Sequence, residues 1–157
     1  MKEYNPPQNF KESTIIGDIF LAGSIEMGTA ENWQKKFIEE FKDTELRFLN
    51  PRRNDWDSSW KQEISNPQFK EQVSWELDGL DYADLIVFYF DPNTKSPITL
   101  MELGMHAKSG KCIVCCPTGF WRKGNVDIVC EKYNIQVVNS FEDLVKEVKM
   151  LTKFWKC

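Results

Sequence analysis

The chain has 157 residues and a formal net charge of −4, with 20 lysine and arginine residues against 24 aspartate and glutamate residues. Its length fits one domain with a single core, and the lack of a basic cluster argues against a nucleic acid polymer as partner. No apolar run approaches the roughly 20 residues that span a bilayer, so no membrane partner is expected. The polar, proline-bearing residues 1–10 differ from a secretory signal, and we expect a cytoplasmic protein.

Short apolar runs alternate with helical patterns along the whole chain. Residues 1–15 are predicted to be a flexible N-terminal arm, and residues 16–157 a single domain. Strands are expected over residues 19–22, 46–49, 84–90, 112–116 and 135–138. Apolar side chains at helical spacing predict intervening helices whose patterns begin near Trp33, Phe69, Ile98, Val126 and Ser140. This alternation predicts an α/β fold, flavodoxin-like or Rossmann-like, in which a five-stranded parallel sheet carries helices on both faces.

The cysteines are expected to pack in the core. Cys112, Cys115 and Cys116 lie within one predicted strand, whereas a redox C-x-x-C motif normally opens a helix. Cys130 and Cys157 do not supply a second pair at the spacing of zinc ligands. The pattern favours small apolar side chains over redox or metal use, and no metal site is predicted.

The segment SPITLMELG, residues 96–104, follows the predicted strand 84–90 and a polar turn. Its one carboxylate, Glu102, therefore lies in the early turns of a helix that starts near the carboxyl end of a strand. Ligands bind at this edge of an open parallel sheet. Leu100, Met101 and Leu103 surround the carboxylate, and a buried glutamate is costly unless it is paired or has a function. We therefore predict that Glu102 is a catalytic residue.

Further ionisable side chains lie close to Glu102 along the chain. Glu76 and Asp78 belong to the preceding predicted helix, and two carboxylates with separated pKa values are typical of glycosidic bond cleavage. A solvent-facing acidic stripe is the alternative for both, and it is favoured for Asp78. His106 follows Glu102 by one helical turn, where a histidine more often satisfies a hydrogen bond than performs catalysis.

Two turns that follow strands are candidates for ligand contact. Gly23 and Ser24 come after the first predicted strand, where exposed amides can hold an oxygen-rich ligand, and a simple turn is the alternative. Asn125 stands at the expected start of a later helix. It is predicted to contact a ligand in its own or a neighbouring subunit, or to serve only as a helix cap.

The long irregular stretch 50–66 is predicted to be functional because loops of this length are uncommon in compact domains. Asp55, Trp56 and Asp57 offer a stacking face beside carboxylates, which suits a planar heterocycle. The alternative is a solvated loop whose tryptophans only pin it to the core.

Together these pieces resemble the nucleoside 2-deoxyribosyltransferase family, in particular its short divergent branch. The resemblance rests on residues 20–25, 50–57, 75–77, 83–84, 96–104 and 119–125. It implies a flavodoxin-like fold, no cofactor, and a homo-oligomer whose active sites borrow residues across an interface. The implied substrates are small nucleosides and free nucleobases.

The resemblance also implies roles for single residues. Glu102 would attack the anomeric carbon of a 2'-deoxynucleoside and expel the base, and a second base would capture the deoxyribosyl ester. Asp55, Trp56 and Asp57 would form the base pocket, in which a protonated aspartate donates to a purine ring nitrogen. Glu76 stands where better-known members carry an aspartate that helps hold or protonate the substrate. Those members also have a tyrosine on the first strand, where residues 19–21 of this chain offer no hydroxyl.

Two other functions stay open at this point. The first is an N-glycosidase of deoxynucleosides or their 5'-monophosphates, in which water resolves the intermediate. Gly23 and Ser24, with basic help from Arg52, Arg53 or Arg122, would then grip a phosphate. The second is a nucleotide-binding sensor without turnover, against which the apolar surroundings of Glu102 argue.

Overall fold

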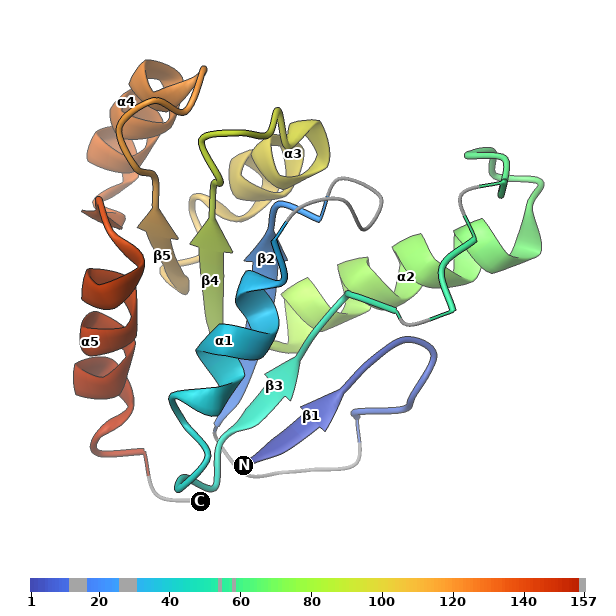
Figure 1. The fold of residues 1–157 in the computed structure, drawn as a ribbon, viewed down its shortest axis with the longest axis horizontal. Coiled ribbons are helices and arrows are strands. Elements are labelled where there is room, and N and C mark those ends of the chain that lie inside the picture. The colour runs from blue at the N-terminus through green and yellow to red at the C-terminus, as the bar shows by residue number, and fades with distance from the viewer. Residues whose placement is uncertain (12–16, 26–30, 54, 58, 156–157) are drawn as a thin grey trace.

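The computed structural model describes residues 1–11, 17–25, 31–53, 55–57 and 59–155 (Figure 1). In these residues the chain forms six strands and five helices. The strands are β1 (Lys2–Tyr4), β2 (Asp18–Gly23), β3 (Arg47–Leu49), β4 (Leu85–Tyr89), β5 (Cys112–Cys115) and β6 (Gln136–Val138). The helices are α1 (Trp33–Glu39), α2 (Pro67–Tyr82), α3 (Pro97–His106), α4 (Lys123–Tyr133) and α5 (Phe141–Thr152).

All strands of the sheet run parallel, in the order β1-β3-β2-β4-β5-β6. The five strands expected from the sequence take the flavodoxin-like order 2-1-3-4-5, which confirms the predicted fold class. The chain moves from β2 outward to β3, and after β4 it moves in the other direction to β5. The strand order therefore reverses between β2 and β4, and a crevice for ligands is expected at their carboxyl ends.

The predicted number of five strands is corrected to six by β1. Residues 2–4 were expected in a flexible arm, and they pair instead with residues 47–49 of β3. Tyr4 is buried, and Phe10 packs edge-on against Trp75 of α2, with 5.2 Å between ring centroids. A three-residue strand with two charged side chains is too short to show alternation, so its sequence gives no strand signal. Residues 12–15 of the expected arm lie outside the described residues.

Helices cover both faces of the sheet, as predicted. In Figure 1, α1 and α5 lie in front of the strands, and their buried side chains share one core cluster with alternate residues of β2, β4 and β5. Buried side chains of α2, α3 and α4 form a second cluster with the other alternate strand residues. Cys115, Cys116 and Cys130 are fully buried in these clusters, so the prediction that they pack as small apolar side chains is confirmed.

Two glycines allow close contacts of β2 with its neighbours. A Cβ atom on Gly79 of α2 would lie 2.8 Å from the ring of Phe20, so only glycine lets α2 approach β2 this closely. A Cβ atom on Gly23 would lie 2.6 Å from both the Trp33 ring and the carbonyl oxygen of Tyr89. Among the helices of the described chain, none is both long and apolar enough to cross a membrane.

Candidate active site

The turns after β2 and β4 are joined by a cluster of hydroxyl groups at the crevice. The Ser24 hydroxyl accepts a hydrogen bond from the Asp91 amide at 3.0 Å and is bonded to the hydroxyls of Thr94, at 2.7 Å, and Ser96. Ser24 and Ser96 are almost completely buried. The Ser24 side chain thus holds the two turns together through hydrogen bonds within the protein. Gly23, its neighbour, packs closely against Trp33 and the backbone of Tyr89.

Ser96 begins α3 with a backbone conformation that is uncommon outside glycine. Its φ of 46° is left-handed, and its hydroxyl bonds within the cluster in place of capping the helix. Strained residues of this kind often lie at functional sites. The residue fixes where α3 starts, and therefore where Glu102 lies relative to the strand edge.

Glu102 lies in the second turn of α3 with only 7% of its surface exposed. Burial, reinforced by the neighbouring carboxyl of Glu76, raises its pKa from 4.5 to about 8. No hydrogen bond joins the Glu102 carboxyl to any residue in the described part of the chain. A carboxyl held mainly protonated at neutral pH is typical of an active site.

Glu76 lies on α2, where it is half-buried, and its carboxyl interacts electrostatically with that of Glu102. Burial raises its pKa from 4.5 to about 7, although the amide of Gln72 acts in the opposite direction by donating to Oε1 at 2.7 Å. The structure therefore brings Glu76 and Glu102 together from two helices, as the sequence suggested. Asp78 instead is exposed and forms an ion pair with Lys11 at 2.9 Å, which agrees with its expected place on a solvated face.

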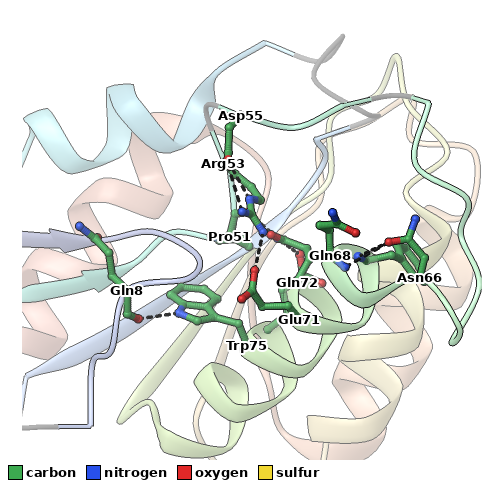
Figure 2. Close-up of polar contacts among 11 residues, drawn as sticks. Gln8, Pro51, Arg53, Asp55, Asn66, Gln68, Glu71, Gln72 and Trp75 are labelled. Atoms are coloured by element: carbon green, nitrogen blue, oxygen red, sulfur yellow. Dashed lines mark hydrogen bonds and ion pairs between the residues drawn. The ribbon is translucent and has the colours of Figure 1, made fainter.

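The loop after β3 is fastened to the first turns of α2 (Figure 2). The Arg53 guanidinium makes two hydrogen bonds to Asp55, at 2.8 and 3.1 Å, and one to Glu71 at 3.3 Å. One residue further along α2, the Gln72 amide donates to the carbonyl oxygen of Pro51 at 2.8 Å. The loop is thus held on α2 next to the carboxyl pair.

The three predicted base-pocket residues lie on this loop and differ in their surroundings. Trp56 is half-buried and meets Trp60 edge-on, with 5.2 Å between ring centroids. Asp55 and Asp57 are exposed. Hydrogen bonds from Arg53 lower the pKa of Asp55, and those from Ser59 lower the pKa of Asp57. The structure therefore opposes the expectation of a protonated aspartate here, because exposure and hydrogen-bond donors both favour the carboxylate.

Asn125 lies away from the carboxyl pair of its own chain. It is exposed on α4, and with Leu100 and Gly104 of α3 it lines a groove of about 330 Å³ between the two helices. Leu100 and Gly104 each stand two residues from Glu102, about 160° around the helix, so the groove lies on the opposite side of α3. The alternative that Asn125 caps the helix is wrong, because Arg122 holds the cap position.

His106 takes no part in the carboxyl pair. It is half-buried at the other end of α3, with its Nε2 atom 3.9 Å from Asp81, and burial lowers its pKa. The expectation that it satisfies a local contact fits this place.

The sequence interpretation missed three side chains that shape the site. Gln72 precedes Glu76 by four residues, a helical spacing that could have signalled their contact. Thr94 and Ser96 carried a signal only in their hydroxyl-rich composition, because their partner Ser24 is distant in the sequence.

The fold and site define an α/β protein of flavodoxin-like topology in which a buried carboxyl on α3, Glu102, interacts with a half-buried carboxyl on α2, Glu76. Residues 16–120 match the sequence model of the family described as "Nucleoside 2-deoxyribosyltransferase like". This match covers more than half of the chain, and the protein belongs to that family. Glu76, Glu102 and the loop after β3 fall inside the match, whereas Asn125 falls beyond it.

The fold is also found among solved structures. The chain is similar to a conserved protein from Enterococcus faecalis V583, with a TM-score of 0.61 and 19% identity over 87% of this chain and 99% of that one. At this identity the likeness concerns the fold alone. No curated protein matches the chain.

Proposed function

We propose that the protein is a nucleoside 2'-deoxyribosyltransferase, in which Glu102 is the nucleophile and Glu76 carries the proton of the departing base. The observation that carries this proposal is the pairing of a buried carboxyl on α3, Glu102, with a half-buried one on α2, Glu76, each with its pKa raised toward or above neutrality. Family membership supports the substrate class of nucleosides. Two carboxyls of this kind are the usual equipment for cleaving a glycosidic bond.

The proposed reaction needs one proton in the carboxyl pair. Because the pKa of Glu102 is about 8 and that of Glu76 about 7, this proton is held mainly by Glu102 in the free protein, and the reactive form is the one in which it has moved to Glu76. Ionised Glu102 attacks C1' of the deoxynucleoside, the bond between C1' and the base nitrogen breaks, and protonated Glu76 gives its proton to the departing base. The acceptor base then attacks C1' of the Glu102 ester and returns a proton to Glu76, so the pair is restored. Two inversions give net retention at C1'. The chemistry draws on side chains alone and calls for no cofactor.

The proposal places the nucleobase against the loop after β3. Trp56 supplies a ring face, and Asp55 and Asp57, as exposed carboxylates, supply acceptors for N–H groups at the edge of a base. Because both carboxylates have lowered pKa values, the proton for the departing base is assigned to Glu76 and not to this loop.

The proposal includes a homo-oligomer in which a second copy covers α3. Ile98, Met101 and Met105 are each about half exposed, and they form an apolar stripe along the helix. Ile98 and Met105 lie one turn before and after Glu102 on the same side of the helix. A second copy on this stripe would remove water from the site, and its Asn125 could then reach the substrate that the same chain's Asn125 does not face.

The test is a base-exchange assay resolved by chromatography. Deoxyinosine or thymidine is incubated with and without free adenine or cytosine, using wild type, Glu102→Gln and, as a matched control on α4, the exposed Glu131→Gln. We expect a new deoxynucleoside from wild type and the control, and a loss of at least about 10³-fold in Glu102→Gln. Free deoxyribose formed at one rate, with or without acceptor, would indicate the N-glycosidase. Binding without turnover would indicate the sensor.

A further inference from the structure

Gln72 is a buried polar side chain on α2. It is only 4% exposed, one helical turn before Glu76 on α2. Its Nε2 atom donates to the Pro51 carbonyl oxygen at 2.8 Å and to Glu76 Oε1 at 2.7 Å. Because a backbone carbonyl can only accept, the atom that contacts Pro51 must be the nitrogen, and the orientation of the amide is fixed.

The other end of the amide is unsatisfied. The Gln72 Oε1 atom is buried without a hydrogen-bond partner among the residues that the structure describes. An unpaired buried acceptor destabilises a folded protein, and native structures hold few of them. Leucine or methionine at this position would avoid the cost, so the two contacts of the NH₂ group are what the glutamine contributes.

The loop after β3 has a second attachment to α2 that does not involve Glu76. Arg53 reaches Glu71, one residue before Gln72, and is also held by Asp55 (Figure 2). If Gln72 served only to hold the loop, it would duplicate the ion pair between Arg53 and Glu71. The Gln72 attachment differs from that ion pair because the nitrogen that holds the loop also contacts the carboxyl of Glu76.

We propose that Gln72 is a positioning residue that couples the loop proposed to bind the base to the protonation of Glu76. The inference rests on the proposed function for the role of Glu76. The contact from Nε2 favours the carboxylate, because an N–H donor stabilises negative charge on its acceptor. Glu102, across from Glu76 on α3, acts in the other direction by disfavouring a second charge. A base that shifts the loop moves the Pro51 carbonyl and with it the Gln72 amide. This movement changes the hydrogen bond from the amide to Glu76 and therefore the proton affinity of the Glu76 carboxyl.

The experiment titrates the Glu76 carboxyl directly. Protein with ¹³C-labelled glutamate is followed by NMR from pH 5 to pH 9, and the Glu76 signal is assigned by its absence in Glu76→Gln. In Gln72→Met, which keeps the length of the side chain and removes the donor, the midpoint of the Glu76 titration is expected to rise by about one pH unit. Gln72→Glu, which places a further carboxyl beside Glu76, is expected to raise it as well.

Two controls separate this role from loop anchoring. Glu71→Gln weakens the Arg53 attachment and is expected to leave the Glu76 midpoint unchanged. Gln68→Met, an exposed position on the same helix, is expected to change neither the midpoint nor the activity. In the base-exchange assay, the pH above which kcat/KM falls is expected to rise in Gln72→Met and not in Glu71→Gln.

The outcomes are distinguishable from those that test the proposed function. An unchanged Glu76 midpoint in a folded Gln72→Met or Gln72→Glu protein would overturn the inference, as would an equal shift in Glu71→Gln. A shifted midpoint in a protein that turns over no nucleoside would support the coupling and overturn the transferase.

Discussion

Replacing Glu102 by glutamine is expected to stabilise the protein at alkaline pH while abolishing the proposed activity. In the folded chain the pKa of Glu102 is about 8, against an ordinary value of 4.5. The folded state therefore binds more protons than the unfolded state between these values, and its stability falls as the pH rises through them. At about 1.4 kcal/mol for each pKa unit, this difference is worth about 5 kcal/mol above pH 8 and nothing below pH 4.5.

Urea unfolding of wild type and Glu102→Gln at pH 4.5 and pH 9 measures this directly. The two proteins should have nearly equal unfolding free energies at pH 4.5, and the variant should exceed wild type by several kcal/mol at pH 9. Since whole domains are stable by only about 5–15 kcal/mol, the effect is large. The exposed Glu131→Gln should show no such trend. A Glu102→Gln difference that does not grow with pH would refute the view that a buried, destabilising carboxyl is kept here for function.

Three further predictions follow from the site. The dependence of wild-type kcat/KM on pH is expected to be bell-shaped. It should fall below about pH 7, where the carboxyl pair holds two protons, and above about pH 8, where it holds none. Glu76→Gln should lower kcat about 10²-fold or more and remove the fall at alkaline pH. Arg53→Ala should raise the KM for the acceptor base several-fold with little change in kcat, because it frees the loop from Glu71; an unchanged KM would place the base elsewhere. Met101→Glu should shift the protein toward a monomer in light scattering, and an unchanged mass would exclude the α3 stripe as the interface.

The fold was largely predictable because its central strands appear in the sequence as apolar runs. The strands β2, β4 and β5 are buried on both faces, so nearly every residue is apolar and their detection needs no tertiary information. β1 could not be found in this way. Lys2 and Glu3 are exposed on it, and what makes the segment a strand is the free edge of β3, which no local pattern reveals.

The candidate site was predictable where burial followed from neighbouring residues in the sequence. Glu102 stands among apolar residues of one helix, and its burial in the structure agrees with that pattern. The expectation of one protonated aspartate among Asp55 and Asp57 could not be judged from the sequence, because protonation depends on exposure and on donors such as Arg53, which are set by the path of the loop. Gln72 was missed for a related reason, since one of its two partners is a backbone carbonyl that the sequence does not place.

The edge position of β1 protects the sheet from self-association. An edge strand exposes a row of unpaired N–H and C=O groups, and natural proteins blunt such edges with short strands and charged side chains. β1 has three residues, of which Lys2 and Glu3 carry opposite charges, whereas the strand that it covers, β3, is Arg-Phe-Leu with two fully buried side chains. Without residues 2–4, β3 would become an open edge, and intermolecular strand pairing there would be expected to cause aggregation of an otherwise folded domain.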